Sequence, residues 1–183
     1  MKTFNKIILL FFIFSSSLLA KWEVCISSTD DSSHNAYLFV NFNADENAFI
    51  SIVVSMELMD NWSAAYQRYS IAGVFIYSDK INFDDNSYYL KIKRNSKNSI
   101  NYIISEYNNI EIDDLSGIFI GKYDEQGIGA GRVGNNLVKI LLDSISCDLY
   151  NEEELLASFN LSGLKQIMKE NIGDTEWYNH LYK

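Results

Sequence analysis

The sequence predicts a mainly β domain, an antiparallel β-sandwich or barrel-like fold that ends in an amphipathic helix. Three observations predict this class. Short runs rich in β-branched and aromatic residues recur along the chain, as is typical of strands. Clusters of Asn, Asp, Ser and Gly separate these runs and favour turns. Proline is absent from the 183 residues, so the turns depend on those four residue types.

Residues 1–20 have the layout of a secretory signal peptide, with a basic start, an apolar run and small residues before Ala20. The apolar run, Ile7–Phe14, is much shorter than the roughly 20 helical residues that span a bilayer. We therefore expect cleavage after Ala20 and no membrane span afterwards. Residues 21–183 would form a single exported domain, periplasmic or secreted, and the abundance of Asn and Ile is typical of a bacterial protein.

The chain is acidic, with a formal net charge of −9. The predicted leader contains two lysines and no acidic residue, so its removal would take the net charge to −11. Such a surface repels nucleic acid and anionic lipid headgroups, so we expect no nucleic-acid partner. It would suit a basic protein partner, although an acidic balance also serves solubility alone.

The chain contains two cysteines, Cys25 and Cys147. In an oxidising compartment an even pair predicts a disulfide, which here would tie the first strand to the late part of the chain. The alternative, a reactive thiol, requires a base nearby. The two histidines, His34 and His180, are expected in a polar loop and near the C-terminus, where they offer no such base.

Seven segments are predicted to be strands because each is short, rich in β-branched or aromatic residues and bounded by turn residues. Within Tyr89–Lys93 polar and apolar side chains alternate, as they do in a strand that is buried on one face. Turns are expected at 43–47 and 95–99. The predicted strands are 21–27, 36–42, 48–56, 73–78, 88–94, 100–105 and 155–161.

Three segments between these strands have other patterns. Met56–Ser70 fits a helix or a long irregular hairpin, and both stay open. Leu137–Ile145 fits a helix or a strand, and the strand is favoured because the segment is short and apolar on both faces. In residues 112–121 an Asp pair precedes an apolar run, which predicts a short helix capped by Asp113 or Asp114.

The C-terminal region predicts the amphipathic helix. Leu164, Ile167 and Met168 recur at i, i+3 and i+4, which places them on one helical face. Ser162 precedes them and is expected to cap the helix. A last helical turn is expected in the tail at 173–183.

The stretch Gly127–Gly134 contains G-A-G-R-V-G, which matches the dinucleotide-binding pattern G-x-G-x-x-G. That pattern binds a pyrophosphate only where the loop leaves a strand directly and opens a helix in a parallel unit. Here residues 122–128 separate it from the preceding strand, and the earlier strands look antiparallel. We therefore expect a turn between strands and no cofactor.

No residue pattern predicts catalysis or a metal site. Nucleophilic catalysis needs a serine or cysteine beside an oriented base, and zinc usually takes three protein ligands from His, Cys and carboxylates. Acidic residues cluster where turns are expected, and such clusters usually face solvent. The acidic clusters are Asp30–Asp31, Asp84–Asp85, Asp113–Asp114 and Glu152–Glu154.

Aromatic residues make up 14% of the chain, and most are expected to fill the core. Tyrosine and tryptophan also provide rigid contact area at protein interfaces. Two aromatic stretches are therefore candidate interfaces. Their residues are Trp62, Tyr66, Tyr69, Trp177, Tyr178 and Tyr182.

Three stretches occur in the order seen in the invasion-associated locus B family of exported bacterial proteins. "KWEVC" resembles the family's opening Trp followed by Cys, and "GVFIYSDK" is similar to its central strand with an acidic turn. "LLASFNLSGLKQIMKE" resembles its closing strand-glycine-helix element, with Phe159, Leu161 and Gly163 at the matching spacing. The resemblance implies a small periplasmic β-sandwich with a C-terminal helix and no catalytic residues.

The function that these observations favour is an exported protein-binding factor without catalytic activity, of the inhibitor or immunity type. One alternative is an invasion-associated or envelope-stress role, as the resemblance implies. The other is a carboxylate-dependent hydrolase, in which two acidic residues would form an acid/base pair.

Overall fold

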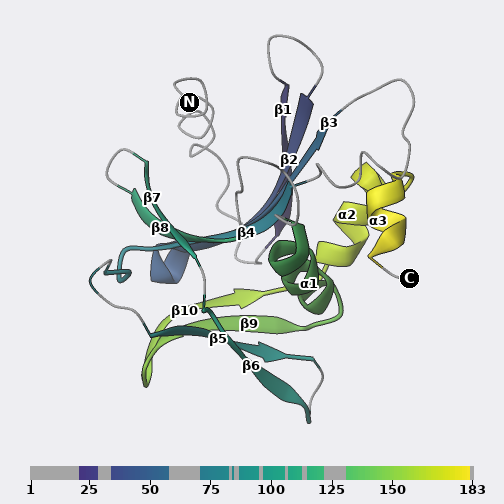
Figure 1. Ribbon diagram of the computed structural model, residues 1–183. Coiled ribbons are helices and arrows are strands. Elements are labelled where there is room, and N and C mark those ends of the chain that lie inside the picture. Colours follow the sequence, from purple (N-terminus) through teal and green to yellow (C-terminus); the bar gives the residue numbers. More distant parts are fainter. Residues whose placement is uncertain are drawn as a thin grey trace.

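The computed structural model of the chain consists of two antiparallel sheets and a few short helices (Figure 1). We call the six-stranded sheet sheet A and the four-stranded sheet sheet B. The prediction of a mainly β, sandwich-like fold with a helix near the C-terminus is confirmed. The structure describes residues 21–28, 34–57, 71–82, 84, 87–94, 97–105, 107–112, 115–121 and 131–181.

All strand pairs are antiparallel, and the chain changes sheet three times. In spatial order, sheet A contains β1 (Trp22–Ser28), β2 (His34–Asn43), β3 (Ala48–Glu57), β4 (Ile71–Ser78), β8 (Leu115–Ile120) and β7 (Asn108–Ile112). Sheet B contains β10 (Glu154–Asn160), β9 (Ser146–Asn151), β5 (Tyr88–Lys93) and β6 (Ser99–Ile103).

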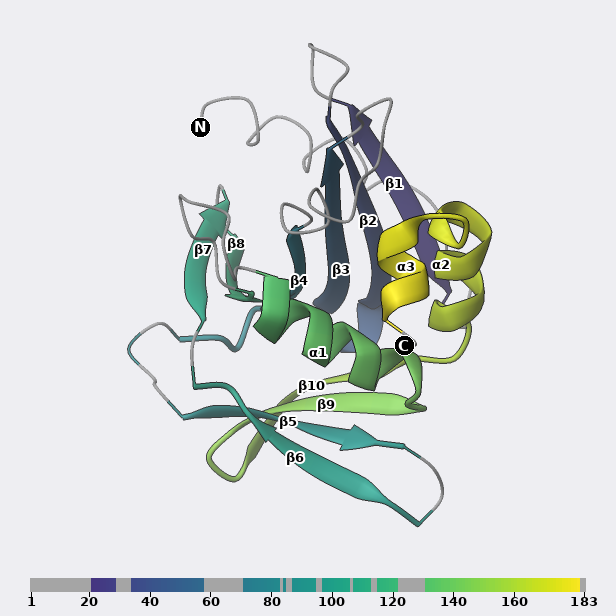
Figure 2. The ribbon, with the colours of Figure 1, turned by 45° about the vertical axis from the view of Figure 1, so that its right-hand side comes forward.

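The main core lies between the two sheets. Alternate side chains of each strand point to opposite faces, so Ile50 and Ile52 of β3 pack with Leu90 and Ile92 of β5, and all four are fully buried. The helix α1 (Gly131–Leu142) packs against β4, and it lies between the sheets on one side of the molecule (Figures 1 and 2).

Sheet A also carries apolar side chains on its outer face, opposite the main core. Phe49, Phe75 and Tyr77 form a second cluster there, with ring centroids 5.5 Å (Phe49–Phe75) and 5.3 Å (Phe49–Tyr77) apart. The Phe75 ring lies over Gly117, where a Cβ atom would come within 2.4 Å of the ring. The absence of a side chain at this glycine lets the ring lie close to the sheet.

The prediction of a strand at Leu137–Ile145 was wrong, because residues 137–142 belong to α1. Leu137, Val138 and Leu141 are buried while Lys139 is exposed. Positions i, i+1 and i+4 share one helical face, so the apolar run has a helical stripe.

The short helix predicted in residues 112–121 is also absent. Ile112 is instead the last residue of β7, and it pairs with Leu115, the first residue of β8. The Asp pair that was expected to cap the helix lies outside the described residues. Of Met56–Ser70, the first two residues end β3 and residues 58–70 are outside the described part.

The C-terminal amphipathic helix is confirmed as α2 (Leu164–Ile172), with Leu164 and Met168 buried. Its N-cap is Gly163 at φ 89° without a side-chain cap bond, so the capping role predicted for Ser162 was wrong. A last helix, α3 (Glu176–His180), follows and is capped by the hydroxyl of Thr175, which accepts from the Tyr178 backbone N–H.

A small polar cluster joins the two sheets at the β2–β3 connection. A 3-10 turn at Ala44–Glu46 places the Glu46 carboxylate 2.6 Å from the backbone N–H of Ser158 on β10. The Asn43 side-chain amide donates to the Ser158 carbonyl at 2.8 Å and to the Glu46 carboxylate at 2.8 Å. We call Asn43, Glu46 and Ser158 the β10 clamp.

Candidate functional site

The outer face of sheet B carries a row of four large side chains, one from each strand. Register partners across an antiparallel sheet lie on the same face, and Ile103, Tyr89, Tyr150 and Leu155 are successive partners from β6 to β10. Ile103 is 76% exposed and Leu155 is 40% exposed. We call these four residues the sheet B row.

The two tyrosines at the centre of the row stack on each other. Their ring centroids are 5.1 Å apart and the ring planes differ by 8°. The stacking occupies one face of each ring, and Ile103 and Leu155 are the next register partners on the other sides of Tyr89 and Tyr150. The row therefore combines two aliphatic side chains with a stacked tyrosine pair.

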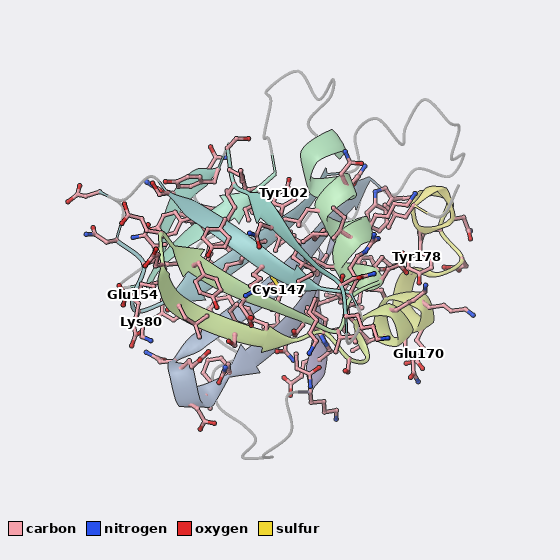
Figure 3. All side chains as sticks on the ribbon, turned by 90° about the horizontal axis from the view of Figure 1, so that it is seen from below. Lys80, Tyr102, Cys147, Glu154, Glu170 and Tyr178 are labelled. Carbon is pink, nitrogen blue, oxygen red and sulfur yellow. The ribbon has the colours of Figure 1, made fainter. Side chains whose placement is uncertain are left out.

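The outer face has opposite charges at its two ends. Next to the row, the β9–β10 connection carries Glu152 and Glu153, and β10 begins at Glu154; all three are exposed. At the other end, β5 and the β5–β6 connection carry exposed basic residues. Figure 3 shows this face from below, with Glu154 at the end of sheet B away from α2 and α3. The basic residues are Lys91, Lys93, Arg94 and Lys97.

The disulfide predicted between Cys25 and Cys147 does not form, and both residues are free thiols. Cys147 is fully buried and points into the main core from β9. On β1, Val24 packs against that core, so its neighbour Cys25 points to the outer face of sheet A. The alternation of β1 thus turns Cys25 away from the core in which Cys147 lies.

Neither thiol is activated. Burial raises the pKa of Cys147, and the Asp148 carboxylate adds to that effect. Partial burial, followed by the charge of Glu23, raises the pKa of Cys25. Since the thiolate is the nucleophile, both shifts reduce the reactivity of these cysteines near neutral pH.

Of the six aromatic residues predicted to form an interface, the two that the structure describes are buried rather than exposed. Trp177 and Tyr178 are buried, at 3% and 5% exposure. The Trp177 indole N–H donates to the Asn135 side-chain oxygen at 3.1 Å, and the Tyr178 hydroxyl donates to the Lys165 carbonyl at 3.3 Å. These two residues fix α3 to the domain. Trp62, Tyr66, Tyr69 and Tyr182 lie outside the described residues.

His34 is the first residue of β2, paired with Glu57, rather than part of a loop. His180 is the last residue of α3. Within the described ranges, no group of three or more His, Cys, Asp or Glu residues could hold a metal ion. Among the described residues, none of the helices has the length and hydrophobicity of a membrane-spanning segment.

The prediction of a turn in the glycine stretch was wrong for residues 131–134, which are helical. Gly131 begins α1, and Gly134 is buried within the helix. Residues 127–130 lie outside the described part, so the G-x-G-x-x-G pattern is described only from its second glycine onwards. Helix α1 connects β8 of sheet A to β9 of sheet B. Because both sheets are antiparallel, this connection is not the parallel unit of a dinucleotide-binding fold.

The comparisons with known proteins identify no relative. No family model, no curated protein and no solved structure matches the chain. The resemblance to the invasion-associated locus B family therefore stays a prediction.

The sheet B row was not predicted from the sequence. The alternation of Tyr89–Lys93 is a signal that Tyr89 and Lys91 share one exposed face, and the structure agrees with it. The other members come from strands whose register a single sequence does not reveal. The strand β9, which provides Tyr150, was not predicted at all.

Proposed function

We propose that this chain is an exported protein-binding factor, without catalytic activity, that recognises its partner through the outer face of sheet B. The sheet B row is the observation that carries this proposal. Apolar groups exposed together and rimmed by polar residues are typical of protein interfaces. Tyrosine is among the residues that most often dominate binding energy at such sites.

The geometry of the row favours a protein over a sugar as the ligand. Aromatic platforms use ring faces, and one face of Tyr89 and one face of Tyr150 are already stacked on each other, with ring centroids 5.1 Å apart. A protein surface can instead pack against the aliphatic ends of the row and accept hydrogen bonds from tyrosine hydroxyls.

The charges beside the row support a basic partner surface at one end. The exposed Glu152–Glu154 segment adjoins Leu155 and Tyr150, and the whole chain is acidic at −9. Complementary charge raises the association rate and selects partners. Such attraction weakens with salt, because the Debye length falls from about 10 Å at 0.1 M to about 3 Å at 1 M. Export rests on the composition of residues 1–20.

The experiment compares two immobilised variants with the wild type in an envelope extract of the source cells. We expect the wild type to retain a discrete protein at low salt, and Leu155→Lys to reduce its retention at least about tenfold, the equivalent of about 1.4 kcal/mol. The matched control is Ile26→Lys, because Ile26 on β1 is 58% exposed and belongs to the other sheet.

Equal retention by Leu155→Lys and the wild type would contradict the proposed surface. Equal losses in both variants would show a general effect of added charge, and they would contradict it as well. Finding the unprocessed chain in the cytosol would contradict the export part of the proposal.

A further inference from the structure

The free edge of β6 is the outer limit of sheet B (Figures 1 and 2). In an antiparallel pair, residues alternate between those bonded to the neighbouring strand and those whose N–H and C=O groups point away from it. The bonds from the Ile104 N–H to the Tyr88 carbonyl (3.2 Å) and from the Arg94 N–H to the Asn98 carbonyl (2.9 Å) fix this alternation at both ends of the β5–β6 hairpin.

It follows from the register that Ile100 and Tyr102 bond to β5. The backbone groups of Ser99, Asn101 and Ile103 then point outward from the sheet. Within the described part of the chain, no hydrogen bond uses these outward groups.

This edge lacks the features that usually prevent edge-to-edge pairing. Charged residues, proline and bulges protect edge strands, and Ser99–Ile103 contains no charged residue and no proline and pairs with β5 in unbroken register. The edges of sheet A differ: β1 contains Glu23 and packs against α2, and β7 contains Glu111. The edge of β10 is bonded by the β10 clamp.

We propose that β6 pairs with β6 of a second copy of this chain, antiparallel and about a two-fold axis at Asn101, to give a continuous eight-stranded sheet. The outward groups match in this register, because Asn101 meets Asn101 of the partner copy and Ser99 meets Ile103. Each of these three bonded pairs exchanges two backbone hydrogen bonds. The inference goes beyond the proposed function and does not depend on it.

The side chains of β6 are compatible with themselves in this register. On the core-facing side, Tyr102 of one copy lies opposite Ile100 of the other, and aromatic–β-branched pairs of this kind stabilise antiparallel sheets. Both residues are only half-buried in the single chain, where they pack against the main core. On the outer side, β6 contains no charged residue that could lie opposite the same residue of the second copy. Self-pairing therefore brings no like charges together within the strand.

The dimer is expected to be weak. One pair of five-residue strands buries less surface than the roughly 1,200 Å² of a stable complex. The net charge of −9 on each copy also opposes association. Because salt screens that repulsion, dimerisation should strengthen with ionic strength, whereas binding of a basic partner should weaken.

Sedimentation equilibrium of the purified protein, from about 1 μM to about 1 mM, the range of weak complexes, tests the proposal. We expect a monomer–dimer equilibrium that Asn101→Pro weakens at least about tenfold, since two symmetric backbone bonds are lost. Proline at this position leaves the β5–β6 bonds intact, because the Asn101 N–H points outward. The matched control, Asn101→Ala, keeps that N–H and should dimerise within about threefold of the wild type.

A charge exchange tests the two-fold axis itself. Asn101→Lys and Asn101→Asp should each be monomeric, since like charges would meet across the axis, and an equimolar mixture should form a heterodimer. Amide exchange provides a check on folding, because Ile100 and Tyr102 should stay protected in every variant.

Three results would overturn the proposal: a monomer at every concentration, a dimer that Asn101→Pro leaves unchanged, or a mixture that fails to associate. None of them would affect retention of a protein partner by the sheet B row, so failure here is distinguishable from failure of the proposed function.

Discussion

The two edges of sheet B meet solvent in different ways. At β10 the outward N–H and C=O of Ser158 are bonded by Glu46 and Asn43, side chains that substitute for a neighbouring strand. At β6 the corresponding groups of three alternate residues have no such substitute within the described chain. One sheet can therefore have a closed edge and an open edge, and the open edge is the one with backbone groups available for association.

Removal of the β10 clamp should destabilise the protein most. Glu46→Ala removes the carboxylate that accepts from the Ser158 N–H at 2.6 Å and from the Asn43 amide at 2.8 Å. Hydrogen bonds to charged groups contribute about 1.5–3 kcal/mol. We expect the free energy of unfolding to fall by about 2 kcal/mol, measured by urea denaturation.

Asp45→Ala is the matched control for this variant, because Asp45 lies in the same 3-10 turn and is exposed. Its expected effect is at most about 0.5 kcal/mol. A loss of similar size in both variants would mean that the turn, and not the clamp, stabilises this corner.

A smaller effect is expected from Asn43→Ala. The variant loses two hydrogen bonds of the Asn43 side-chain amide, one to the Ser158 carbonyl and one to the Glu46 carboxylate. We expect the free energy of unfolding to fall by about 1 kcal/mol. Because both residues act on Ser158, the double variant with Glu46→Ala should lose less than the sum of the single losses. Additive losses in the same denaturation series would show that the two residues stabilise the edge independently.

The smallest effect is expected at the open edge. Ile103 is 76% exposed, so Ile103→Ser should change the free energy of unfolding by less than about 0.5 kcal/mol in dilute solution. The measurement is denaturation at a concentration where the chain is monomeric. A loss above about 1.5 kcal/mol would mean that Ile103 packs within its own copy, and the contrast between the edges would then be weaker.

The sequence was most informative where side chains alternate. Polar and apolar side chains alternate in Tyr89–Lys93, and β5 occurs there with its burial alternating in the same way. At Leu137–Ile145 the prediction was wrong, because this apolar run is too short to distinguish the period of a helix from that of a strand. Helix α1 also begins at Gly131, within a glycine-rich stretch whose composition favours turns.

The site was harder to predict than the fold because it depends on register. Ile103 and Leu155 are 52 residues apart in sequence and share a row only because β5 and β9 lie between their strands. Aromatic content indicated an interface but not its position, and Trp177 was selected although it packs in the core.

The state of the two cysteines has a consequence for how the protein can be produced. The chain contains no other cysteine, and both are free, so no covalent cross-link has to form before the domain is complete. Dithiothreitol should therefore leave the melting temperature unchanged, and recombinant material should fold in a host compartment that has no oxidase.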